Sequence, residues 1–246
     1  MLSVSLITVS FNPDDTIIEA FESAASQSVT PFEHIWIDAS PDHSALRRVL
    51  EVFPRLTVIH EPDLGLYYAL NKALSLVKGD IIGFLHADDL LASADILWQI
   101  QHQFKNPKVD AVYGDLWYVS SDLQRVLRRW QSGYPSSFRK GWMPPHPALY
   151  FRRSVIDRVG LFRTDLGTAA DYEWMLRAIE IKQLQLAYLP QVVVKMRTGG
   201  MSNANINARK SALFNDLHAW RVNGFSWPTA IAAVGLKKIL KLQQFF

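Results

Sequence analysis

The sequence predicts an α/β fold in which a mostly parallel central sheet is flanked by helices on both faces. First, 246 residues, 49% of them apolar, suffice for one large domain with a substantial core. Second, strand and helix patterns alternate through residues 1–115. Third, four predicted strands end in polar or acidic residues. Because the carboxyl ends of parallel strands meet at one edge of a sheet, these residues predict a ligand site there.

The elements follow from the spacing of apolar residues along the chain. Strands are predicted over residues 4–10, 33–38, 56–60 and 81–85, and helices over 16–27, 44–53, 66–77 and 94–104. A strand over 111–113, a β-hairpin over 116–130 with its turn near 121–122, and an ordered loop over 141–147 come next. Helices over 151–159 and 171–181, a strand over 186–197 and a glycine loop at 199–200 follow.

Charge and composition exclude several classes of protein. The net charge is only +3, and the basic residues form short clusters rather than a stripe, so nucleic acid is not an expected partner. The absence of cysteine excludes disulfides and thiolate metal sites. The apolar stretch at residues 4–9 is too short for a signal peptide, and no segment approaches the ~18 apolar residues of a membrane span. We therefore expect a cytoplasmic location.

The segment of residues 81–89, with the sequence IIGFLHADD, carries the strongest chemical signal. A buried strand stops there at Asp88 and Asp89. Two adjacent carboxylates repel each other unless a cation lies between them. A divalent metal with an anionic substrate explains the pair. The alternative is a turn or a helix N-cap, which Asp also favours.

Motifs for other nucleotide-binding or metal enzymes are missing. The first predicted strand is followed by SFNP rather than G-x-G-x-x-G, and the chain contains no G-x-x-x-x-G-K-[ST]. It also contains no H-E-x-x-H zinc motif. A dinucleotide-binding fold, a P-loop enzyme and a zinc enzyme are therefore all disfavoured.

A series of short motifs within residues 3–203 resembles family 2 glycosyltransferases of the GT-A fold. The resemblance is to the small bacterial members that build cell-surface polysaccharides. The motifs, in order, are ITVSFN (7–12), IDAS (37–40), EPDLGLY (61–67), NKA (71–73), GD (79–80), HADD (86–89), YGD (113–115), PHP (145–147), ADYE (170–173) with Arg177, and RTGGMS (197–202). Each motif is weak by itself, but their common order is specific.

The resemblance implies a Rossmann-like GT-A domain over residues 1–225. Residues 1–115 would form the nucleotide-sugar-binding half and 116–225 the acceptor-binding half, with a basic amphipathic helix over 226–246. It further implies an inverting transfer of a sugar from a nucleotide-diphosphate donor, with UDP-sugars favoured, to a hydroxyl of a glycan or lipid-linked saccharide. Mg²⁺ or Mn²⁺ would assist departure of the nucleoside diphosphate.

The resemblance also assigns roles to individual residues. The donor nucleotide would be bound by Val9, Phe11, Asn12, Asp38, Asp63, Lys72 and Asp88. The metal would be held by Asp88 and Asp89, and Asp171 would be the general base that deprotonates the acceptor. Acceptor-side candidates are His146, Trp174 and Arg177.

Several of these residues have structural alternatives. Asp38 suits a turn, Lys72 a solvated helix face and Asp171 a helix N-cap. Trp174 suits a core position, whereas an exposed tryptophan would pack on a sugar. Glu173 is the rival base, but two residues away on a helix it points to a different side than Asp171. Arg197 suits either a phosphate or a carboxylate partner.

The chain departs from the family pattern at a few positions. His86 stands where relatives usually carry Asn or another small polar residue, and it would serve either the metal and donor sugar or the packing. Leu64 and Tyr68 replace positions that are often basic and acidic, and Ala39 replaces a common glycine. These changes leave the donor sugar open rather than the reaction class.

The last predicted helix, over residues 228–246, has two distinct faces. One face carries Lys237, Lys238, Lys241 and Gln244, and another carries Ala232, Leu236, Ile239 and Phe246. This pattern suits peripheral contact with an anionic bilayer on the inner face of the cytoplasmic membrane. The alternative is a terminal helix that packs on the domain with its lysines exposed.

Two other functions compete with the transferase hypothesis. A sugar-1-phosphate nucleotidyltransferase shares the sheet but needs a glycine-rich loop after the first strand, which this chain lacks. A non-catalytic nucleotide-sugar-binding protein would not need the carboxylates Asp88, Asp89 and Asp171.

Overall fold

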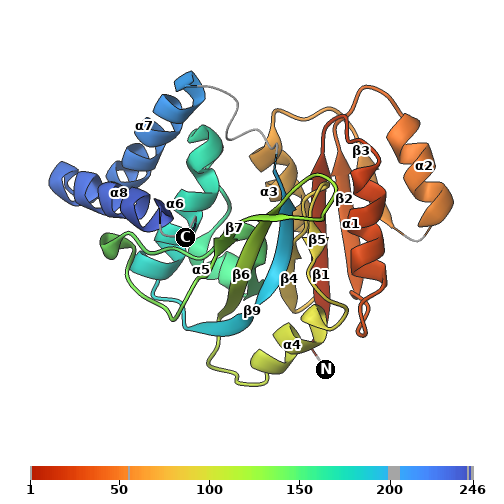
Figure 1. Ribbon diagram of the computed structural model, residues 1–246, viewed down its shortest axis with the longest axis horizontal. Coiled ribbons are helices and arrows are strands. Elements are labelled where there is room, and N and C mark those ends of the chain that lie inside the picture. Colours follow the sequence, from red (N-terminus) through yellow and green to blue (C-terminus); the bar gives the residue numbers. More distant parts are fainter. Residues whose placement is uncertain (1, 55, 199–205, 243, 245–246) are drawn as a thin grey trace.

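A computed structural model describes residues 2–54, 56–198, 206–242 and 244. Its described part is built around one nine-stranded sheet (Figure 1). The strands are β1 (Val4–Ser10), β2 (Glu33–Asp38), β3 (Thr57–His60), β4 (Ile81–Phe84), β5 (Leu90–Leu91), β6 (Ala111–Val119), β7 (Val126–Trp130), β8 (Leu149–Arg152) and β9 (Leu186–Arg197). The α-helices are α1 (Thr16–Ala25), α2 (Ser44–Val52), α3 (Leu66–Leu76), α4 (Ile96–Gln103), α5 (Val155–Val159), α6 (Ala170–Leu176), α7 (Ile206–Val222) and α8 (Trp227–Leu242).

The strand order is β3-β2-β1-β4-β8-β6-β9-β5, and β7 pairs with β6 outside this path. Strands β1 to β4 are mutually parallel, and β6 is parallel to β9. The strand β8 is antiparallel to both β4 and β6. Because β4 and β6 therefore run the same way, the carboxyl ends of β1, β2, β4, β6 and β9 lie at one edge of the sheet, which we call the ligand edge.

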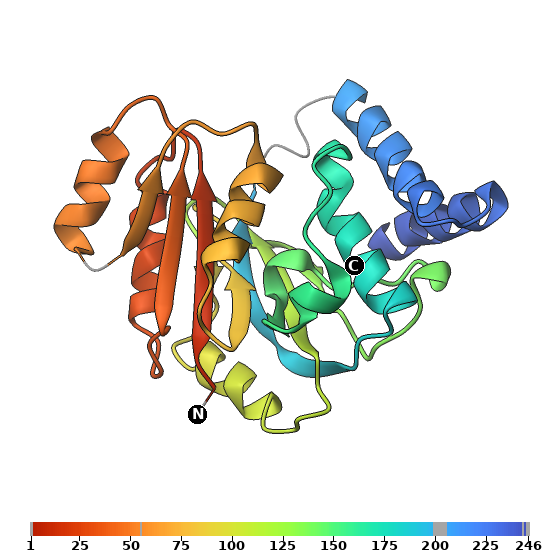
Figure 2. The ribbon, with the colours of Figure 1, turned by 180° about the vertical axis from the view of Figure 1, so that it is seen from behind.

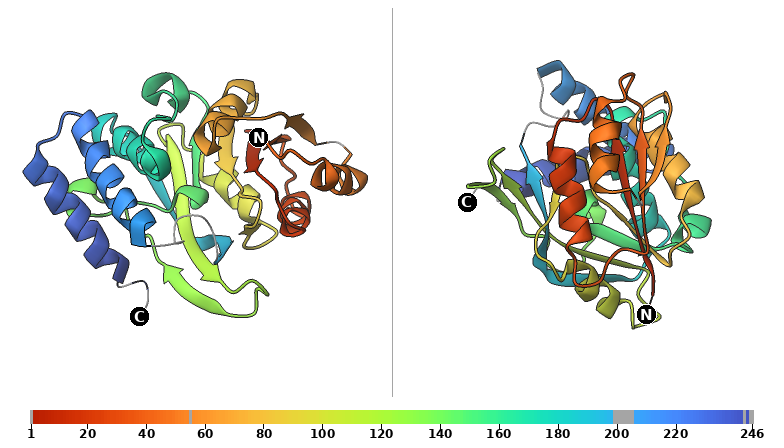
Figure 3. Two further views of the ribbon diagram at one scale, coloured as in Figure 1. Left: turned by 90° about the horizontal axis from the view of Figure 1, so that it is seen from above. Right: turned by 90° about the vertical axis from the view of Figure 1, so that its right-hand side faces the viewer.

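Helices cover both faces because the central strands are apolar on both sides. In β1, Val4 and Leu6 pack toward α1 and α4, whereas Ile7 and Val9 pack toward α3, α5 and α6. Figure 2 shows α3 lying over this second face, with the helices of the second half beside it. The sheet curls between the two halves of the chain, as the views in Figure 3 show.

The structure confirms most predicted elements and corrects a few. The segment 151–159 was predicted as one helix, but its start belongs to β8 and only Val155–Val159 is helical. A short apolar run cannot be assigned to strand or helix by periodicity alone, and here β4 and β6 provide the pairing partners. The predicted strand at 111–113 continues to Val119 as the first strand of the hairpin, and the two-residue strand β5 was not predicted.

Two long helices, α7 and α8, complete the second half. The sequence analysis predicted α8 but not α7. The helix α8 packs against α7 and the short 3-10 helix η1 (Phe138–Lys140) through Ala230, Ala233 and Val234. Within the described residues, no helix is both long and apolar enough to cross a membrane. Phe246 and the predicted glycine loop at 199–200 lie outside the described residues.

Candidate active site

The ends of β1 and β2 form the first part of the site. Asp38 is completely buried at the end of β2, and its Oδ1 accepts hydrogen bonds from Ser10 Oγ at 2.7 Å and Ser40 Oγ at 2.6 Å. Its Oδ2 lies 2.9 Å from His60 Nδ1. Asp38 is thus held in place by three short contacts. It fixes the loops that follow both strands.

The loop after β1 has an unusual backbone conformation. Asn12 has a φ of 49°, in the left-handed region that few non-glycine residues occupy. Its backbone N–H donates to Ser40 Oγ at 2.8 Å, which ties this turn to the Asp38 cluster. The neighbouring Phe11 ring is 67% exposed, whereas Val9 is buried in β1. A flat apolar ring next to fixed polar groups is a surface on which a nucleotide base can pack.

Two further donor-side candidates lie around the start of α3. Asp63 Oδ1 accepts the backbone N–H of Gly65 at 2.7 Å, so Asp63 shapes the turn before the helix. Lys72 forms a half-exposed ion pair with Glu61, which follows β3. The lysine therefore has a carboxylate partner in this structure. Among the described residues, no hydrogen bond or ion pair joins Lys72 to Asp88 or Asp89.

Asp88 and Asp89 lie in the turn between β4 and β5, and their environments differ. Asp88 is half-buried, and its backbone carbonyl accepts a hydrogen bond from Arg197 at 2.9 Å. Asp89 is 0% exposed, and neither of its carboxylate oxygens has a hydrogen-bond partner among the described residues. Burial raises the pKa of Asp89 well above its ordinary value, and the charge of Asp88 adds to the rise, while Arg197 partly counters it. A lone buried carboxylate favours either a proton or a cation.

The carboxylate pair fits a divalent ion that is shared with a phosphate ligand. The described residues contain no group of three or more His, Asp or Glu side chains that could hold a metal by themselves. Hard cations such as Mg²⁺ are commonly bound by one or two carboxylates together with substrate phosphates. The unpartnered oxygens of Asp89 beside Asp88 match that donor set.

Two histidines, His86 and His146, lie near the Asp88 and Asp89 pair. His86 is half-buried, and burial lowers its pKa while the charges of Asp88 and Asp171 oppose that shift. His146 stacks on Phe84 with ring centroids 4.7 Å apart and lies 6.3 Å from the His86 ring. Burial, with the neighbouring His86, lowers the pKa of His146 to about 3, so its ring is neutral. His146 is therefore a buried neighbour of His86 and does not reach the surface.

Asp171 brings a carboxylate from the second half to the ligand edge. It is half-buried in the first turn of α6, and its Oδ1 accepts the backbone N–H of Tyr172 at 2.7 Å. Burial raises the pKa of Asp171, and the Tyr172 N–H, the charges of Lys237 and His86, and the Tyr67 hydroxyl oppose the rise. The charges of both Asp88 and Asp171 act on His86, so the three side chains belong to one region of the ligand edge.

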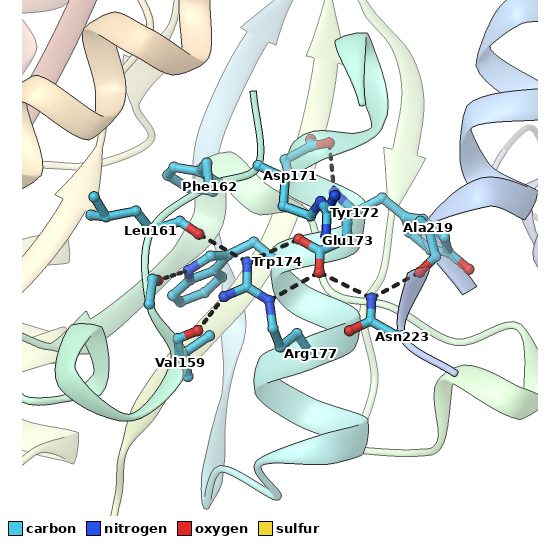
Figure 4. A network of polar contacts seen from close by, with 12 residues as sticks. Val159, Leu161, Phe162, Asp171, Tyr172, Glu173, Trp174, Arg177, Ala219 and Asn223 are labelled. Carbon is cyan, nitrogen blue, oxygen red and sulfur yellow. Dashed lines mark hydrogen bonds and ion pairs between the residues drawn. The ribbon is translucent and has the colours of Figure 1, made fainter. Parts of the chain in front are cut away.

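The rival base, Glu173, is committed to an ion pair. It is 1% exposed and accepts two hydrogen bonds of 2.9 Å from Arg177. Asn223, the residue after α7, donates to the same carboxylate at 3.0 Å. Arg177 also donates to the backbone carbonyls of Val159 and Leu161. Figure 4 shows the Glu173 carboxylate directed into this network and the Asp171 carboxylate directed away from it.

The remaining acceptor-side candidate, Trp174, lies in the core. Its ring is 1% exposed, packs against Phe151 and Phe162, and donates its indole N–H to the carbonyl of Gly160 at 2.8 Å. Packing explains this residue, as the alternative interpretation of the sequence expected. Trp174 and Arg177 thus have packing and ion-pair roles in the interior next to Asp171.

Other residues at the ligand edge were not singled out from the sequence. Burial raises the pKa of Tyr118, Arg128 opposes the rise, and the charges of Asp89 and Asp171 add to it, so Tyr118 lies within electrostatic range of both carboxylates. The Arg128 guanidinium lies 3.8 Å from the Tyr118 ring centroid. The alternation of aromatic and arginine residues in the hairpin was the only available signal. Of the two partners predicted for Arg197, a phosphate or a carboxylate, the structure shows a carboxylate, that of Glu19.

Comparison with known proteins identifies the family. The model described as Glycosyl transferase family 2 matches residues 5–161, well over half of the chain. The chain belongs to glycosyl transferase family 2. The family match starts in β1 and ends after α5, so it includes the whole β1–β4 edge, Asp88 and Asp89. The predicted recognition is thereby confirmed at the level of the family, and the enzyme class is glycosyltransferase.

Individual relatives agree with this assignment. An uncharacterized glycosyltransferase of Mycobacterium tuberculosis is 29% identical over 226 residues, which are 87% of this chain and 81% of that protein. A PGL/p-HBAD biosynthesis glycosyltransferase of Mycobacterium bovis is 26% identical over 218 residues, 82% of this chain and 80% of that one.

Solved structures confirm the predicted fold class. The mannosyltransferase PcManGT from Pyrobaculum calidifontis, in complex with GDP-Man and Mn²⁺, superposes with a TM-score of 0.69 at 24% identity over 96% of this chain and 70% of that chain. Residues 1–349 of S. aureus TarS with UDP-GlcNAc give 0.68 at 16% identity, over 96% and 72% of the chains. The match covers only 43% of a longer TarS chain.

Proposed function

We propose that this protein transfers a sugar with inversion from a nucleotide-diphosphate donor to a hydroxyl of a glycan or lipid-linked saccharide in cell-surface polysaccharide biosynthesis. The observation that carries the proposal is the placement of carboxylates from both halves of the domain at the ligand edge. Asp88 and Asp89 lie in the turn after β4 and Asp171 lies in the first turn of α6, and the charges of Asp88 and Asp171 both act on His86. One carboxylate group is thus available for the donor and another for the acceptor within a single site.

The reaction follows from these positions. The acceptor hydroxyl gives its proton to the Asp171 carboxylate while its oxygen forms a bond to the anomeric carbon. The bond from that carbon to the diphosphate oxygen breaks, and the nucleoside diphosphate leaves with the electron pair. Attack from the face opposite the leaving group inverts the anomeric centre. Burial, which raises the pKa of Asp171, makes its carboxylate a stronger base than an exposed aspartate.

The donor side has its own set of residues. Phe11 and Asn12 would face the base, and Asp38 would fix their loops. Asp88 and Asp89 would hold Mg²⁺ or Mn²⁺, which supplies charge neutralisation for the departing diphosphate. Solved neighbours of the same fold bind GDP-Man with Mn²⁺ in one case and UDP-GlcNAc in another, which supports a nucleotide-sugar donor. We favour UDP-sugars.

The acceptor class rests on the relatives. The Mycobacterium bovis relative is named for PGL/p-HBAD biosynthesis, which supports an acceptor hydroxyl on a glycan or lipid-linked saccharide. Membership of the family disfavours a nucleotidyltransferase. A non-catalytic nucleotide-sugar-binding protein is the alternative that the experiment must separate.

An Asp171→Asn variant tests the proposal. We expect sugar transfer to fall by about 10²- to 10⁴-fold, the usual contribution of a general base. The Mn²⁺-dependent stabilisation by UDP, followed by thermal denaturation, should persist. At a hundredfold excess of UDP over its dissociation constant, the free energy of unfolding should rise by about 2.7 kcal/mol. GDP, CDP and dTDP, each with and without Mn²⁺, identify the preferred base.

A matched control is Asp165→Asn, because Asp165 lies in the same segment in an exposed pair with Arg163. It should leave transfer unchanged. Unchanged transfer in Asp171→Asn would remove Asp171 from the base role. The absence of any metal-dependent shift with all four nucleotides would contradict the donor site itself.

A further inference from the structure

The helix α8 exposes a row of apolar side chains that nothing in the described structure covers. Ile231 and Ile239 are each 59% exposed, and Leu242 is 62% exposed. Trp227 and Leu236 border them and are nearly half exposed. At about 100° per residue these side chains share one side of the helix, which we call the outer face of α8. Figures 1 and 3 show α8 at the outer margin of the second half, away from β1 to β3.

The opposite side of α8 fixes the rotation of the helix. Ala230, Ala233 and Val234 are buried against the domain. Lys237 pairs with Asp216 of α7 at 2.8 Å, and its ammonium lies 3.6 Å from the centroid of the Tyr172 ring. This lysine was predicted to share an exposed face with Lys238 and Lys241. The structure turns it inward instead, so it is unavailable to a partner.

Gly141 adds a second constraint on how α8 packs against the domain. Its φ is 79°, and a Cβ at this position would lie 2.4 Å from the backbone N of Lys237. The backbone of α8 therefore passes too close for any side chain at residue 141. This close approach and the buried side of α8 together define which side of the helix faces the domain.

The charge around the outer face has one sign. Lys238 is exposed at one border of the face, beside Trp227 and Ile231 on the helix. From Leu217 to Phe246 the sequence contains no Asp or Glu, whereas it contains Arg221 and three lysines. A partner must therefore offer an apolar layer together with negative charge. An anionic lipid bilayer has both, and a helix with this distribution lies in the plane of the interface.

We propose that the outer face of α8 docks the protein onto an anionic lipid bilayer. The 16 residues of α8 would lie flat, about 24 Å long, with the isoleucines and leucines below the headgroups. The acceptor-binding half would then be the half nearest the membrane. This surface is a claim apart from the proposed reaction, and it holds whichever sugar is transferred.

The experiment is sedimentation of the full chain with vesicles of phosphatidylcholine alone or of phosphatidylcholine with phosphatidylglycerol, without nucleotide. We expect binding to the anionic vesicles that weakens as salt rises. Lys238→Gln should weaken it about fivefold, the contribution of one lysine near an anionic surface. The pair Ile231→Ser and Ile239→Ser should weaken it by at least about tenfold.

Phe32→Ser is the matched control, because Phe32 is a similarly exposed apolar residue in the first half. It should bind vesicles like the unaltered protein. Binding that fails in the unaltered chain, or that survives Ile231→Ser with Ile239→Ser, would overturn the proposal. So would a dimer in analytical ultracentrifugation that the isoleucine pair dissociates, because the face would then cover a second copy. Sugar transfer is not part of this assay, so failure here is distinguishable from failure of the proposed reaction.

Discussion

Two buried carboxylates, Asp89 just before β5 and Glu173 in α6, have opposite surroundings. Glu173 is enclosed by Arg177 and Asn223, so its negative charge has a cationic partner and a further hydrogen-bond donor. Asp89 is equally buried, and its oxygens have no hydrogen-bond partner among the described residues. The paired carboxylate fastens α6 to the loop after α5 and to α7. The unpaired one is a destabilising position that the fold retains, which marks it as a place for a ligand.

The largest effect on stability should come from breaking the paired region. Arg177→Met leaves Glu173 buried without its cation, which costs about 3–5 kcal/mol of unfolding free energy. Urea denaturation measures the change. Arg163→Met is the control, because its pair with Asp165 is exposed and should contribute less than about 1 kcal/mol. Equal effects of the two variants would show that the Glu173 network is not the structural fastening described above.

The unpaired region should respond to pH in the opposite sense. Because the folded-state pKa of Asp89 lies above its unfolded value, the folded protein binds this proton more tightly. The contribution of Asp89 to the free energy of unfolding therefore falls as pH rises from about 4 to the folded-state pKa. The slope is at most about 1.4 kcal/mol per pH unit. In chelator and without nucleotide, Asp89→Asn should become increasingly more stable than the unaltered protein as pH rises.

That comparison uses urea denaturation at several pH values, with Asp165→Asn as a carboxylate-to-amide control on the surface. A stability difference that does not change with pH would mean that Asp89 has a partner in the folded protein. Adding Mn²⁺ with the preferred nucleotide should stabilise the unaltered protein and not Asp89→Asn.

The smallest effect on folding is expected at Lys72. Its pair with Glu61 is half exposed, so Lys72→Met should change the unfolding free energy by less than about 1 kcal/mol. If Lys72 releases Glu61 to bind a donor phosphate, nucleotide affinity should fall about tenfold, the usual scale of a charged hydrogen bond. Lys78→Met is the control, because Lys78 is an exposed lysine two residues after α3. Unchanged affinity would leave Lys72 with a structural role alone.

Local sequence signals predicted the first half of the fold well. The strands β1, β2 and β4 are continuous apolar runs that end at polar residues, and each was predicted to within a residue. The strand β8 was missed because its three apolar residues have no period of their own. Its strand conformation depends on pairing with β4 and β6, which is a long-range property.

The site shows the same division between local and long-range information. The position of Asp88 and Asp89 at a strand end, and the different directions of Asp171 and Glu173, follow from local spacing. The enclosure of Asp38 by Ser10, Ser40 and His60 does not, because these residues come from three separate strand ends. Neither does the nearness of Tyr118 to the carboxylates, since it depends on how the sheet curls.

The antiparallel strand β8 has a consequence for how the chain folds during synthesis. β8 lies between β4 and β6, and it leaves the ribosome about 65 residues after β4. At 5–20 residues per second, β4 then waits several seconds with one bare edge. A bare apolar edge invites pairing with another nascent chain. The β1–β4 half is therefore the stage at which this protein is most exposed to misassembly, and slower translation before residue 149 would lengthen that interval.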